Sequence, residues 1–579
     1  MPPRPFRLYW CVIASVAIGL TLLAGSAAHA EFKFAGRPWL GKHSVYSTHG
    51  IVSTMHPLAS QAGIDIMKRG GNAFDAAIAT AAVEAVTVSA GCGLGGEPFV
   101  IMYEAKTGRV YGLNGSGKAP MAATRDYFVS RGHKTMPLTG PLAAAIPGEV
   151  AGWEDILQRF GTRTLASLLE PAIGYAEEGH AVSARTARGF QMMNDKLNAY
   201  PDTAAVFTKN GAPLEEGDIL VQKNLANTLR RVGAGGSEEF YRGDTAREMV
   251  RAIRAAGGLY TEKEFAQHES TWHEPPISTT YRGYTVYETT PPSQGFLLLE
   301  MLNIMEGLDI GEMGFYNAEA VHAMVQAKKL AMADRNEYVG DPDYIDNPLD
   351  ELISKPWAAQ RRALMNPAAD INFEPGPMAA PIPGNDNTSY FCVVDKEGNA
   401  LSFIHSLSMG FGGGFVAGET GVTLNNRIGR GFSLVDGHPN VIEPGKRTMH
   451  TLNAYMVFKN DKPYLVGATP GGDRQIAWNA QVISNVIDHG LDPQEAVEAP
   501  RWTSTPSTDP ANIDDPFVLE LEGGMAIEEV AKLKAKGHEV DVQETGGYGG
   551  SVKLIMIDPK TGVRISGSDP RTDGHAAVV

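Results

Sequence analysis

The sequence predicts a fold of the α+β class, in which long helices accompany β-hairpins. Apolar residues recur at helical spacing in several long segments, including 58–68, 72–86 and 317–338. Elsewhere, short apolar runs bounded by turn residues are typical of paired strands, as in 388–395 with 400–407. At 579 residues, with 43% hydrophobic and 20% charged residues, the chain can bury a large core.

The same rules predict the remaining elements along the chain. Helices are expected at 165–178, 224–232, 244–256, 297–306 and 475–487, and strands at 98–103, 281–287, 455–458 and 464–467. Glycines 91, 93 and 96 have the spacing of a dinucleotide-binding fingerprint, but a helix precedes them and a strand follows. That order is the reverse of what nucleotide binding needs. We therefore expect a tight helix-to-strand turn, and whether it also borders a site stays open.

The N-terminus has the pattern of a secretory signal peptide covering residues 1–30. Arg4 and Arg7 precede a short apolar run at 11–23, and Ala28-His29-Ala30 forms a cleavage site of the A-x-A type. The run is too short to span a bilayer, and no later stretch reaches that length. We expect a periplasmic or secreted protein without a stable membrane span; an uncleaved anchor is the alternative.

Charge and motif content exclude several classes of function. The formal net charge is −16 and no basic run occurs, which argues against nucleic acid as a partner. There is no G-x-S-x-G elbow, Walker A motif or H-E-x-x-H motif, and the histidines do not cluster at metal spacing, so we expect no cofactor and no metal. Once the signal is removed, Cys92 and Cys392 remain, which predicts packed thiols and no disulfide framework.

The segment that organises the chain is the polar loop that ends at Asn387-Thr388 and enters an apolar strand. The preceding stretch, 366–387, is rich in Pro, Ala and Gly and predicts a mobile linker. A Thr at a chain N-terminus can use its own α-amine, of pKa about 7.7–8.0, as the general base. We therefore hypothesise that the chain cuts itself before Thr388 and then uses Thr388 as its nucleophile. The alternative is an Asx turn that opens an ordinary strand.

Gly471 and Gly472 precede the helix expected at 475–487. Unobstructed backbone N–H groups at a helix N-terminus can stabilise a developing oxyanion. A simple helix-entry turn is the alternative interpretation.

Taken together, the motifs resemble the γ-glutamyltranspeptidase family of N-terminal-nucleophile (Ntn) hydrolases along nearly the whole mature chain. The matching blocks are Gly70-Gly71-Asn72-Ala73, 91–96, Pro147-Gly148, 281–284, Ala333-Asp334-Arg335, 340–342, Thr388 with Val394-Asp395, Gly418-Glu419, Asn425-Asn426, Gly445-Lys446-Arg447 and 470–472. The resemblance implies a four-layer αββα sandwich. It also implies a proenzyme that is cleaved at Asn387-Thr388 into a large subunit (31–387) and a small subunit (388–579), which form a heterodimer.

The resemblance also assigns roles to individual residues. Thr388 matches the family's processing residue and nucleophile, and Gly471 and Gly472 match its oxyanion hole. Ser406 falls where the family has a Thr whose hydroxyl supports the nucleophile. Ser408 falls where many members have a substrate-contacting Asn.

Departures from the family pattern concern the groups that hold the amino-acid part of a γ-glutamyl substrate. Ser116 stands where glutathione-accepting members carry a carboxylate-binding Arg, and His450-Thr451 replace a Ser-Ser pair. Arg430 replaces the acid that holds the α-ammonium group, and Arg427 replaces a nearby Gln or Glu. With Asn426, these residues are the expected substrate-binding set. They indicate the divergent amidase and acylase-like branch, unless Arg427 and Arg430 are merely solvated loop residues.

The sequence thus predicts an exported, self-processing amide hydrolase that forms an acyl-enzyme on Thr388. Its expected substrate is a small amide whose acyl group carries a carboxylate. Two alternatives remain: a glutathione hydrolase or γ-glutamyl transpeptidase with substitute anchors, and a non-catalytic exported binding protein.

Overall fold

The computed structural model describes residues 42–373, 388–505, 517–546 and 550–579. All of them belong to one compact unit, Lys42–Val579. The predicted signal peptide, Asn387 and the predicted linker from residue 374 onward lie outside the described residues, so those predictions stay predictions. Among the described residues, no helix is both long and apolar enough to cross a membrane.

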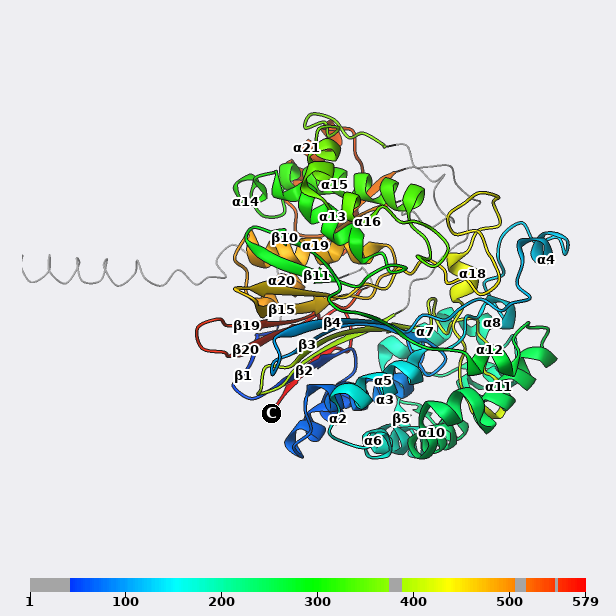
Figure 1. The fold of residues 1–579 in the computed structure, drawn as a ribbon. Helices are drawn as coiled ribbons and strands as arrows, with labels where there is room; N and C mark the ends of the chain where they lie inside the picture. The colour runs from blue at the N-terminus through cyan, green and yellow to red at the C-terminus, as the bar shows by residue number, and fades with distance from the viewer. Residues whose placement is uncertain (1–41, 374–387, 506–516, 547–549) are drawn as a thin grey trace, which may run out of the picture. The chain divides into compact units, whose positions relative to one another are not determined.

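Two seven-stranded antiparallel sheets form the centre of the unit (Figure 1). The first sheet has the order β21 (His575–Val578), β2 (Ile51–Thr54), β12 (Ser389–Val394), β13 (Ala400–Ser406), β3 (Glu97–Glu104), β4 (Arg109–Asn114) and β9 (Thr271–His273). The second sheet has the order β1 (Val45–Ser47), β20 (Arg564–Ser568), β19 (Lys553–Ile557), β15 (Lys462–Ala468), β14 (Tyr455–Lys459), β11 (Tyr284–Glu288) and β10 (Ile277–Tyr281).

The two sheets pack face to face, and helices cover their outer faces. Strands β12 and β13 contact β15, and β12 also contacts β19, so the inner faces meet near the middle of each sheet. The first sheet is covered by α2 (Pro57–Lys68), α3 (Ala73–Thr87) and α5 (Glu149–Phe160), with α6 (Leu165–Glu178), α10 (Lys223–Arg242) and α11 (Asp244–Ala255) beyond them (Figure 1). The second is covered by α13 (Gly295–Glu306), α19 (Arg474–Ile487) and α20 (Pro493–Glu498), with α15 (Ala318–Tyr338) and α17 (Lys355–Arg362) packed on α13. The predicted four-layer αββα sandwich is confirmed.

Burial on both faces explains why the central strands are apolar throughout. Every residue of β12 and of β13 is buried, because one face meets the second sheet and the other meets α3. Helix α3 is itself buried along its whole length, as its all-round apolar sequence predicts. Its N-terminus is closed by a capping box between Asn72 and Asp75. The hydrophobic core therefore continues from α3 into the first sheet.

Both sheets contain strands from before and after residue 388. In the first sheet, β12 from the later part pairs with β2 from the earlier part, and β13 pairs with β3. In the second sheet, β14 pairs with β11. Separating the two parts of the chain would therefore break hydrogen-bonded ladders in both sheets.

One predicted strand, at 281–287, is wrong. The structure has a hairpin there, in which β10 ends at Tyr281 and β11 begins at Tyr284. The two residues between them, Arg282 and Gly283, have φ of 51° and 80°. Two successive left-handed residues match a tight two-residue turn, whose twist suits antiparallel strands. The alternating pattern of the segment concealed this turn because the strands on its two sides are both partly buried.

Candidate active site

Thr388 lies at the entrance to β12, with only 2% of its surface exposed. Its Oγ1 atom is 3.0 Å from the Oγ atom of Ser406, the last residue of β13. The backbone N–H of Ser408 donates a hydrogen bond of 2.7 Å to the same Ser406 oxygen. The hairpin thus brings two hydroxyl groups together, in the arrangement expected for a nucleophile and its supporting group.

The glycine turn that connects α3 to β3 lies directly beside Thr388. A Cβ atom added to Gly91 would be 3.3 Å from both the carbonyl carbon and the carbonyl oxygen of Thr388. The N–H of Leu407 donates a hydrogen bond of 2.9 Å to the Gly91 carbonyl. The turn therefore borders the candidate site, and glycine at position 91 permits this close approach of two backbones.

Gly471 and Gly472 precede α19 in backbone conformations that favour glycine. Their φ angles are 145° and 54°, and a Cβ atom on Gly471 would lie 2.4 Å from the ring of Trp478. The side-chain amide of Gln294 donates to the carbonyls of Gly472, at 3.1 Å, and of Thr451, at 2.7 Å. These contacts hold the glycine pair next to one of the predicted substrate-binding residues.

The alternative that Arg427 and Arg430 are solvated loop residues is wrong, because they are only 1% and 6% exposed. They lie on a short helix, α18 (Arg427–Gly431), where a polar loop was expected. They are three positions apart, which places both on one side of the helix. The side chain of Arg427 donates through Nε to Oε1 of Glu97 across 2.7 Å.

Glu97 is a site residue that the sequence analysis missed. It is fully buried at the start of β3, and its second carboxylate oxygen accepts a hydrogen bond of 3.1 Å from the Gly117 N–H. Burial raises the pKa of Glu97, while the guanidinium of Arg427 opposes that shift. A lone acid at the start of an apolar strand is a signal that could have identified it, since charged residues are almost never fully buried unless they are paired.

His450 lies against Glu97 but is not charged. Its Nδ1 atom is 3.6 Å from the Glu97 carboxylate, and its ring packs on Phe99 with centroids 5.0 Å apart. The pKa of His450 is lowered well below its ordinary value, first by burial and then by Arg427 and Arg447. Because the ring is neutral and 3.6 Å is long for a hydrogen bond, we do not count this contact as an ion pair.

Three buried polar side chains in this region have no hydrogen-bond partner among the described residues. They are the two ring nitrogens of His450 and the hydroxyl groups of Ser116 and Ser408. Buried polar groups are normally satisfied, so each unsatisfied one calls for an explanation. These atoms can therefore hydrogen-bond to a polar ligand at this position.

Arg447 is a second site residue that the sequence analysis missed. It lies beside Ser116, the position at which the resemblance led us to look for an arginine. Its Nε atom donates to the backbone carbonyl of Ser116 at 3.1 Å, and its Nη1 atom is 3.2 Å from the carboxylate of Asp343. It is 6% exposed. The family motif at 445–447 was recognised in the sequence, but its proximity to Ser116 depends on the fold.

The other two predicted substrate-binding residues have mainly backbone contacts. The side chain of Asn426 accepts from the Met409 N–H at 3.0 Å and donates to the Leu138 carbonyl at 2.9 Å. It therefore connects two loops that border the site. Thr451 is 6% exposed and presents its carbonyl to Gln294.

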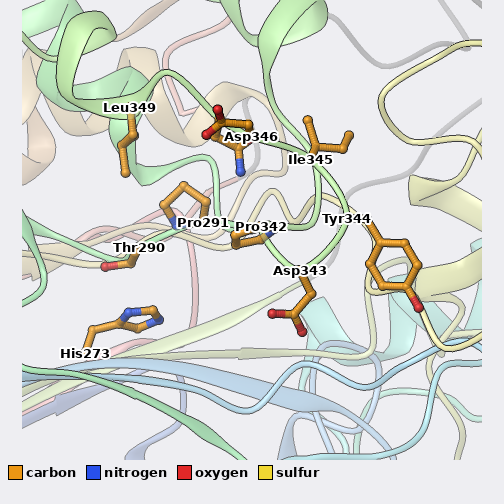
Figure 2. Close-up of a pocket in the computed structure, with 10 residues that line it drawn as sticks. His273, Thr290, Pro291, Pro342, Asp343, Tyr344, Ile345, Asp346 and Leu349 are labelled. Carbon is orange, nitrogen blue, oxygen red and sulfur yellow. The ribbon is translucent and has the colours of Figure 1, made fainter.

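A cleft of about 510 Å³ is lined in part by Asp343, the residue that contacts Arg447 (Figure 2). Its lining residues are His273, Thr290, Pro291, the segment 342–347 and Leu349. In Figure 2, Asp343 lies between His273 and Tyr344. Asp343 also contacts Arg447, so this ion pair connects the lining of the cleft to the candidate site.

Among the described residues, one group has ligand atoms close enough to hold a metal ion: Glu84, Cys92 and His405, within 4.8 Å of one another. The ring of His405 is hydrogen-bonded through Nδ1 to Glu149 and through Nε2 to Glu84, at 2.8 Å and 3.0 Å. A ring that donates from both nitrogens has no lone pair left for a metal. This arrangement therefore does not fit a metal ion, and we derive no step through one.

Comparison with known proteins gives a consistent result. A model of the family described as Gamma-glutamyltranspeptidase matches residues 59–579. The chain is 38% identical to the glutathione hydrolase-like YwrD proenzyme of Bacillus subtilis (strain 168), over 92% of this chain and 99% of that protein. It is 34% identical to the acylase ACY 1 proenzyme of Pseudomonas sp. (strain SE83), over 86% and 88% of the two chains. The crystal structure of cephalosporin acylase from Bacillus halodurans superimposes with a TM-score of 0.85 at 34% identity, covering 95% and 99% of the two chains.

Proposed function

The chain belongs to the γ-glutamyltranspeptidase family, and from this premise we propose that it cuts itself between Asn387 and Thr388 and then hydrolyses amides through Thr388. As a member of this family it is an enzyme, an Ntn-type amidohydrolase, so the second alternative, a non-catalytic binding protein, is wrong. The observation that carries the proposal is the 3.0 Å contact between the hydroxyls of Thr388 and Ser406 at the entrance to a buried hairpin.

The proposed reaction follows from this geometry. Once residue 388 is an N-terminus, its α-amine accepts the hydroxyl proton while the oxygen attacks the substrate carbonyl. The hydroxyl of Ser406 keeps the attacking oxygen oriented. The amides of Gly471 and Gly472 are the proposed donors to the oxyanion. The α-ammonium group then gives this proton to the nitrogen of the departing amine, and water or an acceptor amine resolves the acyl-enzyme.

The interleaved sheets support the proposed subunit organisation. Cleavage before Thr388 would give a large subunit of residues 31–387 and a small subunit of residues 388–579. Both contribute strands to each sheet, so the fragments would remain paired through β12–β2, β13–β3 and β14–β11. The signal-peptide pattern of residues 1–30 supports export, to the periplasm or outside the cell.

The charges around the site support a carboxylate in the acyl group. Arg427, Arg430 and Arg447 are each at most 6% exposed, and Arg427 and Arg447 lie close enough to the neutral His450 to lower its pKa. Glu97 pairs with Arg427 and Asp343 pairs with Arg447, so a substrate carboxylate would join guanidinium groups that are already held in place. Arginine binds carboxylates well because its planar fork matches both oxygens. The acylase names of two relatives are compatible with an acyl group that lacks an α-amine.

The decisive experiment compares glutaryl-p-nitroanilide with γ-glutamyl-p-nitroanilide on the processed enzyme. We expect kcat/KM for the glutaryl compound to be higher by at least about tenfold, a difference of roughly 1.4 kcal/mol. Arg430→Gln should reduce this preference, whereas Arg254→Gln on the exposed face of α11 should leave it unchanged. A clear preference for the γ-glutamyl compound would refute the carboxylate proposal.

One observation favours the second candidate, a glutathione hydrolase. The Glu97 carboxylate lies within the site, 3.6 Å from His450, and could hold an α-ammonium group in place of the acid that Arg430 replaces. The YwrD relative is named as glutathione hydrolase-like. Release of glutamate from glutathione at a rate exceeding glutaryl-anilide turnover would select this candidate.

A further inference from the structure

Three buried charged side chains meet on the helix-facing side of the hairpin that begins at Thr388. They are Glu84 in the last turn of α3, Glu149 at the first position of α5, and His405 on β13, and none is exposed. The imidazole of His405 lies between the two carboxylates, 2.8 Å from Glu149 and 3.0 Å from Glu84. Since a carboxylate oxygen accepts, both ring nitrogens donate and the ring is the cation of this group.

Two neighbouring residues, Trp153 and Cys92, support a negative charge on Glu149 and a positive charge on His405. The Trp153 indole N–H donates to the same Glu149 oxygen at 2.9 Å. Burial acts to lower the pKa of His405, but the adjacent Cys92 and Glu149 outweigh burial and raise it well above the ordinary value. The group is therefore an ordered, charged contact between two helices and one strand.

Glu84 also holds the residue that follows Thr388. The hydroxyl of Ser389 donates to Oε2 of Glu84 at 2.5 Å, while Oε1 accepts from the Met55 N–H at 2.9 Å. Ser389 and His405 are direct partners in the antiparallel register of β12 and β13. One carboxylate oxygen thus ties both strands together at the first pair of the hairpin.

The catalytic hydroxyls lie next to this pair, on the opposite side of the sheet. Successive side chains on a strand point to opposite faces, so Thr388 and Ser406 face away from Glu84 while Ser389 and His405 face it. After cleavage, Thr388 has no preceding residue, and chain ends fray unless they are tied down. The position of its α-amine and hydroxyl then depends on how firmly Ser389 is held.

We propose that Glu84, Glu149, His405 and Ser389 form a clamp that positions Thr388 for self-cleavage and for catalysis. We call this group the Ser389 clamp. Its members do not touch the reacting atoms, so they are positioning residues. The inference rests on the proposed role of Thr388, and it assigns a function to buried charges that the proposed reaction does not otherwise use.

The test is Ser389→Ala, which removes one hydroxyl and leaves the three charged residues in place. We expect slower self-cleavage and a kcat that falls by roughly tenfold to a hundredfold, the range that corresponds to losing a hydrogen bond to a charged group. KM for glutaryl-p-nitroanilide should stay within about twofold, because the acyl-binding side chains are not altered.

Two further variants separate positioning from general loss of structure. Ser389→Thr keeps the hydroxyl on a strand position that tolerates β-branching, and it should restore both rates. Ser402→Ala is the matched control, because Ser402 is a fully buried β13 serine that pairs with the Tyr390 hydroxyl at 2.8 Å. It should change thermal stability as much as Ser389→Ala does, yet leave kcat unchanged.

Each outcome is decisive. If Ser389→Ala matches Ser402→Ala in cleavage rate and kcat, or if Ser389→Thr is as slow as Ser389→Ala, the clamp has no positioning role. If Ser389→Ala does not fold, Glu84→Gln, which keeps the shape of the side chain without its charge, must show the same fall in kcat. A wild-type protein that is never cut at Thr388 would instead defeat the proposed function, which is a different result.

Discussion

The Nε atom of Arg427 lies 2.7 Å from Oε1 of Glu97, in a part of the interior where neither side chain is exposed. Arg427 begins α18 and Glu97 begins β3, so the contact joins two parts of the chain that are 330 residues apart. A buried charge is stable only when it is paired and hydrogen-bonded. The contact is therefore both a structural link across the candidate site and a limit on how much positive charge the site offers to a substrate.

Glu97→Gln should destabilise the protein, because Arg427 loses the carboxylate that it faces. Removing one partner of a buried ion pair typically lowers the free energy of unfolding by about 3–5 kcal/mol. We expect the urea midpoint of unfolding to fall accordingly. The double variant Glu97→Gln/Arg427→Met should recover part of this loss, because replacing both charges is much less costly than removing one. Equal midpoints for wild type and Glu97→Gln would show that the pair contributes nothing to stability.

Thr388→Ala should leave the chain uncut. The wild-type protein is expected to separate on a denaturing gel into fragments of about 360 and 190 residues, since removal of the signal and cleavage before Thr388 divide the chain there. Thr388→Ser retains a hydroxyl and should still be cut. Mass spectrometry of the smaller fragment checks the cleavage position. An N-terminus other than Thr388 would contradict the proposal.

Gly472→Val should lower kcat by about 10²–10³-fold, the loss that follows removal of one oxyanion donor. The reason is that a side chain at a φ of 54° forces the backbone to adjust, which displaces the N–H. Gly490→Val is the matched control: Gly490 also has a positive φ, of 66°, but lies at the other end of α19. The steady-state kinetics of Gly490→Val should match wild type. An unchanged kcat in Gly472→Val would place the oxyanion donors elsewhere.

The stability of the protein should rise with pH between about pH 7 and 10, in part because of Lys553. Burial lowers the pKa of this fully buried lysine from 10.5 to about 7, although Asp569 opposes the shift. In that window the unfolded chain binds a proton at residue 553 that the folded protein does not. The free energy of unfolding therefore increases with pH, by up to about 1.4 kcal/mol per unit.

Lys553→Met should reduce this pH dependence when urea unfolding is measured from pH 7 to 10. Lys560→Met is the control, because Lys560 is an exposed lysine in the turn between β19 and β20. An identical slope for Lys553→Met and wild type would show that Lys553 keeps its proton in the folded protein.

Local sequence patterns were sufficient to predict most elements near the site. The helix expected at 165–178 has the same bounds in α6, and the hairpin that follows Thr388 has the expected strands. These elements depend on periodicity and turn residues, which act over a few residues. The failures occurred where a tight turn interrupted a regular pattern, at Arg282, and where a polar stretch became the buried helix α18.

The sequence by itself determined the class of fold, the family and the residue that we propose as nucleophile, because each is recorded in short contiguous motifs. Only the tertiary structure decided which distant side chains meet: Glu97 with Arg427, Arg447 with Ser116, and Glu84 with both Ser389 and His405. Buried charges require partners, but nothing in a local pattern specifies which partner is chosen. The packing of the two sheets and their helices determines which side chains become partners. It alone brings segments hundreds of residues apart in the chain within hydrogen-bond distance.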